Sequence, residues 1–245
     1  MEVIGVIPAR YSSTRFEGKV LADINGKPMI QHVWEQAKQA KILDEVIIAC
    51  DNEKVESVAS GFGAKTVFTS KSHLSGTDRI AEVVNPLEIK VVVNIQADEP
   101  LIQPIMIDMV ARTLLENKGI SMATLRKRID DTALINDPNV VKVVVDKNDF
   151  AIYFSRSVIP YLAQNSDVKE PVYYKHIGLY AYTKDFLFTF KNLPASGLEK
   201  TEKLEQLRAL EEGFRIKVLE TKHDTIGVDT PEDLERVKEH LKPKG

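Results

Sequence analysis

The sequence has one cysteine, Cys50, in 245 residues, so it has neither an internal disulfide nor a C-x-x-C pair for structural zinc. It also lacks an apolar run approaching the roughly 20 residues of a membrane span. The formal net charge is −3, and no run of Lys and Arg exceeds the three residues 126–128, which argues against a nucleic-acid partner. Because an apolar strand begins at Val3 with no charged leader before it, we expect a cytoplasmic protein with no membrane partner.

The two commonest phosphate-binding loops are missing as well. Neither G-x-G-x-x-G nor G-x-x-x-x-G-K-[ST] follows the first apolar strand. The only G-x-G, at Gly61 and Gly63, follows a helical stretch and predicts a helix C-cap. Any phosphate site in this chain is therefore of another kind.

A cationic loop directly follows the first apolar strand. The strand, residues 3–7, is stopped by Pro8 and is typical of a buried strand in a parallel sheet. The loop carries Arg10, Arg15 and Lys19 among hydroxyl residues and a glycine, so it offers charge and free N–H groups to several phosphate oxygens. A solvated surface loop is the alternative. The position at the end of a first strand, where open α/β sheets bind ligands, favours a polyphosphate grip.

The first half of the chain alternates predicted strands and helices, which indicates an α/β fold with a doubly wound, mostly parallel sheet. Further strands are predicted at 45–49, 66–68, 91–95 and 121–125, and helical spacing recurs after Pro28 and Pro104. After about Asp137 the pattern becomes β-rich, with a predicted hairpin, a strand at 176–183, a helix through Leu204 to Gly213, a strand at 216–219 and a helix from Thr230.

No linker or internal repeat divides the chain, so we expect one domain over residues 1–245. Residues 1–136 form its nucleotide-binding βαβ part. Residues 137–245 are expected to be a β-rich C-terminal elaboration of the same sheet, with a face for a second subunit and a final helix.

Two acidic sites accompany the cationic loop. Gln96, Asp98 and Glu99 lie just beyond the predicted strand 91–95, where the ligand crevice of the sheet should be. Asp229 precedes the helix signal Thr230-Pro231, so it is either an auxiliary cap or a functional carboxylate. Two separated aspartates that converge on Mg²⁺, together with a phosphate grip, are the minimum set for moving a nucleotidyl group.

Seven segments, in chain order, resemble the 3-deoxy-manno-octulosonate cytidylyltransferases: GVIPARYSSTRFEGKVL, SGTDR, NIQADEP, YFSR, YKHIGLYAY, EKLEQLRALE and GVDTPEDLE. The first is shared with other sugar-activating nucleotidyltransferases, whereas YKHIGLYAY and LEQLR are more specific. The resemblance implies a Rossmann-like nucleotide-diphospho-sugar transferase fold. It also implies transfer of CMP from CTP to the acidic sugar 3-deoxy-D-manno-octulosonate (Kdo), with Mg²⁺, by a cytoplasmic homodimer that serves lipopolysaccharide biosynthesis.

The resemblance also implies roles for individual residues. Arg10, Arg15 and Lys19 would bind the triphosphate, and Asp98 and Asp229 would hold Mg²⁺. Thr77 and Asp78 would lie near the nucleotide base, although both can be helix caps. The sugar would be bound by six further residues: Gln96, Arg156, His176, Tyr180, Glu205 and Gln206. Taken without the resemblance, His176 and Tyr180 read as core residues of an apolar strand.

Two positions depart from the family's usual pattern. Val20 stands where Pro is usual, and it restores a backbone N–H. Ala97 stands where Gly is usual before the metal aspartate, and its Cβ would clash if that position needed a positive φ or close approach of a phosphate. Two alternatives to CMP-Kdo synthesis stay open. One is a cytidylyltransferase for another acidic sugar, either an 8-amino Kdo analogue or sialic acid, and the other is a non-catalytic nucleotide-binding regulatory module.

Overall fold

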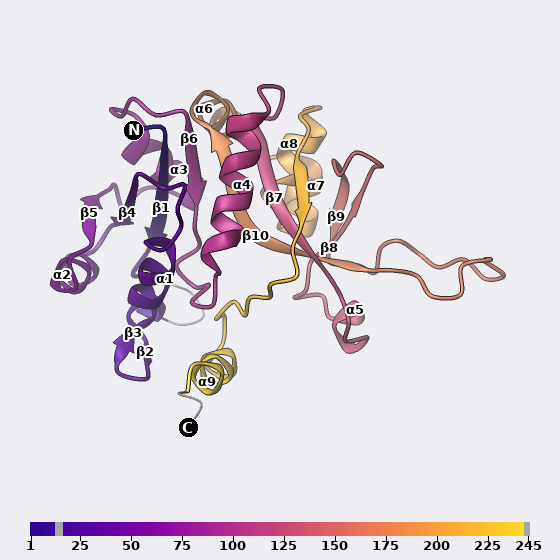
Figure 1. Cartoon of the computed structure of the whole chain (residues 1–245), viewed down its shortest axis with the longest axis horizontal. Coiled ribbons are helices and arrows are strands. Elements are labelled where there is room, and N and C mark those ends of the chain that lie inside the picture. The colour runs from indigo at the N-terminus through magenta and orange to yellow at the C-terminus, as the bar shows by residue number, and fades with distance from the viewer. Residues whose placement is uncertain (13–16, 243–245) are drawn as a thin grey trace.

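The computed structural model describes residues 1–12 and 17–242 (Figure 1). Its centre is a nine-stranded sheet with helices on both faces. The strands along the main path lie in this order: β11 (Lys217–Glu220), β7 (Met122–Arg128), β10 (Tyr174–Thr183), β6 (Val91–Asn94), β1 (Val3–Ala9), β4 (Glu45–Cys50) and β5 (Lys65–Phe68). A hairpin of β8 (Lys142–Val145) and β9 (Ala151–Ser155) joins β10, and β2 (Asp23–Ile24) pairs separately with β3 (Lys27–Pro28).

The N-terminal half of the sheet is parallel, as its apolar strands predict. β1 pairs in parallel with β4 and β6, and β4 pairs in parallel with β5. All four residues of β6 are buried, and so are six of the seven in β1, because helices cover both faces. The five strands predicted in this half of the chain, and the predicted hairpin at β8 and β9, are confirmed.

β10 is the strand that joins the two halves of the chain. It lies antiparallel between β6 and β7, and its register places Tyr180 opposite Asn94 and His176 opposite Arg126. The C-terminal half therefore contributes to the middle of the sheet. Before β10, residues 157–173 form a long excursion that projects away from the body of the molecule (Figure 1).

The helices form two layers. α1, α2 and α4 supply the apolar side chains of one face, and α3, α6 and α8 supply those of the other. The bounds are η1 (Lys19–Leu21), α1 (Met29–Ala37), α2 (Glu53–Gly61), α3 (Gly76–Val84), α4 (Pro104–Glu116), α5 (Ala133–Asn136), α6 (Lys184–Asn192), α7 (Gly197–Glu202), α8 (Leu207–Glu211) and α9 (Pro231–His240). α9 packs against β2 in a small third apolar cluster.

Three details of the fold bear on the expectations from sequence. The predicted helix through Leu204 is wrong as one element, because Lys203 has a left-handed φ of 56° and separates α7 from α8. The predicted cap after α2 is confirmed, with Gly63 at φ 85°. Cys50 is a buried thiol at the end of β4, as expected. Among the described residues, no helix combines the length and apolar character needed to cross a membrane.

Candidate active site

The candidate site lies at the carboxyl ends of β1 and β6, where the parallel strands of an α/β sheet present their loops. Arg10 follows β1 directly, and the turn after β6 leads to Asp98. The backbone N–H of Val228 donates to the carbonyl of Asp98 at 2.9 Å, so the segment before α9 runs against this turn. Two carboxylates that are 131 positions apart in the numbering, Asp98 and Asp229, are brought together in this way.

Lys19 connects the two carboxylates. Its Nζ lies 2.7 Å from Oδ2 of Asp98 and 3.2 Å from Oδ1 of Asp229, and its side chain is only 12% exposed. Gly18 begins η1 with a left-handed φ of 68°, which turns the chain so that Lys19 enters this position. Burial alone lowers the pKa of Lys19, but the charges and hydrogen bonds of the two carboxylates outweigh it, so the pKa is raised.

The same geometry fits a divalent cation. Two carboxylate oxygens that both reach one ammonium nitrogen are the hard, negatively charged donors that Mg²⁺ prefers. Within the described part of the chain, no cluster of three or more His, Cys, Asp or Glu side chains has metal-binding geometry. A metal held by Asp98 and Asp229 would therefore take its other ligands from substrate and water.

Helix α9 does not need the Asp229 side chain as its cap. Thr230 caps it in a capping box with Asp233, whose Oδ2 also accepts from the backbone N–H of Asp229 at 3.1 Å. The carboxylate of Asp229 instead contacts Lys19. Thr230 and Asp233 therefore cap the helix, and the Asp229 side chain is not needed for that role.

Several residues predicted for the base and the sugar lie together on the α3 side of the sheet. Thr77 Oγ1 donates to Oε2 of Glu205 at 2.8 Å, which joins α3 to the segment before α8. Burial raises the pKa of Glu205. Burial, and then the charge of Glu205, raise the pKa of Tyr180, so the Tyr180 phenol stays protonated at neutral pH and can donate a hydrogen bond.

His176 stands beside Tyr180 on β10. The two ring centroids are 5.4 Å apart, and the ring of Phe154 packs edge-on against His176 at 4.9 Å. Nε2 of His176 lies 2.9 Å from Oγ1 of Thr124. Burial lowers the pKa of His176 to about 3, so its ring is neutral at physiological pH and offers one donor and one acceptor.

Other predicted residues have their own partners. Arg10 donates to the carbonyl of Leu74 at 3.2 Å, and Gln96 Nε2 donates to Oδ1 of Asn94 at 2.9 Å. Asp78 forms a capping box with Ser75 at the start of α3, as the capping interpretation predicts. Gln206 is 5% exposed, and its Nε2 has no hydrogen-bond partner among the described residues. Arg15 lies outside the described residues.

Arg156 is placed away from the two carboxylates. Its Nε donates to the carbonyl of Glu202 at 2.8 Å, and its Nη1 donates to the carbonyl of Pro138 at 2.9 Å. Pro138 belongs to the segment 137–141, which lines a cavity of about 770 Å³. The same cavity is bordered by Asp229 and His176. Arg156 therefore lies against the segment 137–141, which forms one wall of this cavity.

The two departures from the family pattern have definite places in the fold. Val20 is 5% exposed and packs in the core from within η1. Ala97 is 6% exposed and is not among the described non-glycine residues with positive φ. A Cβ at position 97 therefore causes no backbone strain.

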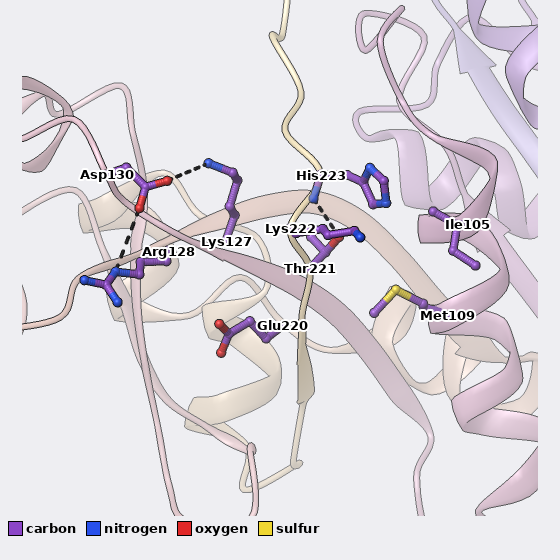
Figure 2. A pocket seen from close by; sticks show the side chains of 9 residues that line it. All are labelled: Ile105, Met109, Lys127, Arg128, Asp130, Glu220, Thr221, Lys222 and His223. Carbon is purple, nitrogen blue, oxygen red and sulfur yellow. Dashed lines mark hydrogen bonds and ion pairs between the residues drawn. The ribbon is translucent and has the colours of Figure 1, made fainter.

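A second hollow, of about 550 Å³, lies where β11 passes α4 (Figure 2). Lys127, Arg128 and Asp130 stand on one side of it, and Ile105 and Met109 of α4 stand on the other. Lys127 lies 3.4 Å from Asp130 and 3.3 Å from Asp224, so its charge is already paired. None of the residues predicted for the site lines this hollow.

Sequence reasoning missed several buried charges near the site. Arg79 of the SGTDR segment is fully buried and donates to Asp51, which in turn accepts from the N–H of Tyr11 beside Arg10. Lys142 is fully buried in β8. Arg126 is 7% exposed, although the run 126–128 reads as the solvated end of a strand. A charge in the middle of an apolar run, as in VVKVVV around Lys142, is the signal that could have shown such a residue.

Glu99 is a further carboxylate that borders the 770 Å³ cavity. Its Oε2 is buried and has no hydrogen-bond partner among the described residues. Burial, and then the neighbouring Asp98, raise the pKa of Glu99 to about 7. At neutral pH Glu99 is therefore only partly ionised, because a second full negative charge beside Asp98 is unfavourable in a buried turn.

Several known proteins are similar to this chain over most of its length. The model of the cytidylyltransferase family matches residues 4–219. A 3-deoxy-manno-octulosonate cytidylyltransferase of Geobacter sulfurreducens is 49% identical, covering 99% of this chain and 100% of that protein. One of Solibacter usitatus is 53% identical, covering 96% of this chain and 93% of that protein.

A solved structure is also similar over its whole length. It is a CMP:2-keto-3-deoxy-manno-octonic acid synthetase in complex with CTP, with a TM-score of 0.92, 42% identity and coverage of 98% of each chain. The relatives cover the parallel sheet, β10 and both carboxylates. The family model covers the sheet, β10 and Asp98 but stops before Asp229. The chain therefore belongs to the 3-deoxy-manno-octulosonate cytidylyltransferases, a family of nucleotidyltransferases.

Proposed function

We propose that this chain transfers CMP from CTP to the anomeric hydroxyl of Kdo and releases pyrophosphate. The observation that carries the proposal is the convergence of Asp98, Asp229 and Lys19 at the carboxyl edge of the sheet, in a chain with full-length relatives of this activity. Two carboxylates and a cation at one point suit a reaction in which phosphate charge is moved. The product would supply lipopolysaccharide biosynthesis in the cytoplasm.

The reaction is an in-line displacement at the α-phosphorus of CTP. The anomeric oxygen of Kdo forms the new bond to phosphorus, the bond to the bridging oxygen of pyrophosphate breaks, and the hydroxyl proton passes to water. Lys19, with Arg10 and Arg15, neutralises the triphosphate and the charge that builds on the leaving group. A bound Mg²⁺, held by Asp98 and Asp229, would supply further neutralisation of phosphate oxygens.

The sugar is held by the polar residues grouped around β10. The neutral His176 ring, the Tyr180 phenol and the Glu205 carboxylate offer the mixed donors and acceptors that sugar hydroxyls need. Gln96 and Gln206 add amide groups, and such a role is supported by the Nε2 of Gln206, which has no hydrogen-bond partner among the described residues. Arg156 is assigned to the carboxylate of Kdo, because a planar guanidinium binds a carboxylate through two parallel hydrogen bonds.

The nucleotide base is assigned to the start of α3. Thr77 and Asp78 lie there, and the contact of Thr77 with Glu205 links this helix to the proposed sugar residues. Binding of the base and binding of the sugar would then both affect the hydrogen bond between Thr77 and Glu205.

A homodimer is the proposed assembly. The projecting segment 157–173 exposes four large apolar side chains, namely Tyr161 (80%), Val168 (54%), Leu162 (41%) and Val172 (41%). Large exposed apolar side chains on one projection are typical of a protein interface. Sedimentation velocity of the intact chain tests this part of the proposal, and a monomer at micromolar concentration would contradict it.

Pyrophosphate release from CTP in the presence of Mg²⁺ tests the activity. Release that requires Kdo supports the proposal. Release with only an 8-amino Kdo analogue or sialic acid would favour a different acidic sugar. Binding of CTP without release of pyrophosphate under any of these conditions would favour a regulatory module. The pairing of Lys19 with two carboxylates argues against such a module.

A further inference from the structure

The buried lysine Lys142 lies next to the proposed sugar site without being part of it. It begins β8, between β9 and β10, and none of its side chain is exposed. Burying an ammonium is costly unless every N–H group has an acceptor. The fold must therefore satisfy all three donors of Lys142 from within the protein.

Three backbone carbonyls do so. Nζ of Lys142 lies 2.9 Å from the oxygen of Asp137, 2.7 Å from that of Val140 and 2.7 Å from that of Arg156. An ammonium has three donors, so its hydrogen-bonding capacity is complete. Burial lowers the pKa of Lys142, as it does for an ammonium removed from water.

Two of these carbonyls belong to the wall segment, residues 137–141, which lines the 770 Å³ cavity. Two other carbonyls of this segment accept hydrogen bonds from residues assigned to the sugar. Arg156 Nη1 donates to the carbonyl of Pro138 at 2.9 Å, and the backbone N–H of His176 donates to that of Val141 at 2.8 Å. The wall segment is therefore held by one buried ammonium, by the Arg156 guanidinium and by the backbone N–H of His176.

We propose that Lys142 is a positioning residue for the acidic sugar: it fixes the wall segment and the backbone of Arg156, so that the Arg156 guanidinium is held ready for the sugar carboxylate. The inference rests on the proposed function, because it takes Kdo as the sugar. Lys142 touches no substrate. It acts through the carbonyls of Asp137, Val140 and Arg156, each of which accepts a hydrogen bond from its ammonium.

Lys142→Met tests the inference, because methionine keeps much of the length of the side chain and removes all three donors. The Kdo KM should rise by about tenfold, which is modest for a change that shifts a binding group by a fraction of an ångström. The CTP KM should stay within about twofold, since the CTP side of the site is built on other strands. Initial rates of pyrophosphate release at varied Kdo and at varied CTP give both constants.

Two further variants separate positioning from stability. Val143→Ala removes apolar volume at the next residue of β8, which is 1% exposed, and should lower the melting temperature without raising the Kdo KM. Lys142→Arg keeps a cation with donors but changes their geometry, and should raise the Kdo KM by about threefold. If Lys142→Met does not fold, the Lys142→Arg enzyme decides the question.

An unchanged Kdo KM in a folded Lys142 variant, with only a lower melting temperature, overturns the inference. So does an equal rise of the Kdo and CTP KM values. These results differ from a failure of the proposed function, in which the unmodified enzyme itself would not release pyrophosphate with Kdo.

Discussion

Replacing Lys19 by Met tests whether this lysine and the proposed Mg²⁺ ion share the same carboxylate oxygens. Nζ of Lys19 lies within 2.7 Å of Asp98 and 3.2 Å of Asp229. A divalent ion that enters between the two carboxylates must first displace the ammonium. Methionine removes the charge and the donors but keeps an unbranched side chain, so the carboxylates should then accept a metal without this competition.

The size of the effect follows from the contacts. A hydrogen bond to a charged group contributes roughly 1.5–3 kcal/mol. The Asp98 and Asp229 side chains are 33% and 49% exposed, so solvent screens both contacts and we take their combined contribution as about 1.4 kcal/mol. That free energy corresponds to about tenfold in affinity. In the absence of CTP, Lys19→Met should therefore bind Mn²⁺ about tenfold more tightly than the unmodified protein.

Electron paramagnetic resonance of free Mn²⁺ during a titration measures this affinity directly. Lys27→Met is the matched control, because Lys27 pairs with Glu35 at 2.8 Å on the surface, where no metal is proposed. Turnover of Lys19→Met with CTP and Kdo should fall by orders of magnitude even though the metal binds, since charge on the departing pyrophosphate loses a partner. Mn²⁺ affinity equal in both variants and in the unmodified protein would refute the shared position.

Three other outcomes are expected. Asp98→Asn and Asp229→Asn should each lower turnover at saturating Mg²⁺ by orders of magnitude, because an amide oxygen is a poor Mg²⁺ ligand, while the circular dichroism spectrum stays unchanged. Near-normal turnover of either variant would mean that the residue is not a metal ligand. Arg156→Ala should raise the Kdo KM by about thirtyfold or more, because a lost charge pair costs roughly 2–5 kcal/mol, with little change for CTP. Impaired CTP binding with normal Kdo kinetics would place Arg156 on the nucleotide. The unfolded chain protonates His176 near its ordinary pKa of 6.5, and the folded chain does so only near a pKa of about 3, so the free energy of unfolding falls as the pH drops through this window, by about 2 kcal/mol at pH 5. Urea titrations of His176→Asn should therefore show a weaker loss of stability between pH 7 and 5 than the unmodified protein. Equal losses in both proteins would mean that the ring is not held neutral.

The nucleotide side of the site could be predicted from the sequence because its signals are local. An apolar run that is buried on both faces needs no distant residue to be recognised as a parallel strand, and ligands gather where such strands end. Arg10 and Asp98 each follow a strand within a few residues, and Lys19 belongs to the loop that leaves the first strand, so strand prediction placed all three at one edge. The helix start at Thr230 was equally local, because a cap and a first-turn proline are read within two positions.

Tertiary structure decided which of these groups touch. The sequence left Asp229 as either cap or ligand. The tertiary structure places its carboxylate against Lys19, beside the hydrogen bond that Val228 donates to Asp98 across the fold. β10 lies between β6 and β7, although β7 and β6 are the nearer pair in the chain, and no pattern within β10 specifies its neighbours.

The buried charges show the same limit more sharply. Lys142 lies in the apolar run VVKVVV, and the sequence shows only that one charged residue interrupts this run. Its three acceptors are backbone carbonyls of residues 137, 140 and 156, and carbonyl oxygens have no sequence signature because every residue has one. Local propensity and apolar pattern depend on side-chain identity and so determined the strands and loops, whereas the cationic loop, the two aspartates and the family resemblance indicated the reaction class. Which backbone groups meet a buried cation depends on the path of the whole chain, and only the tertiary structure decided it.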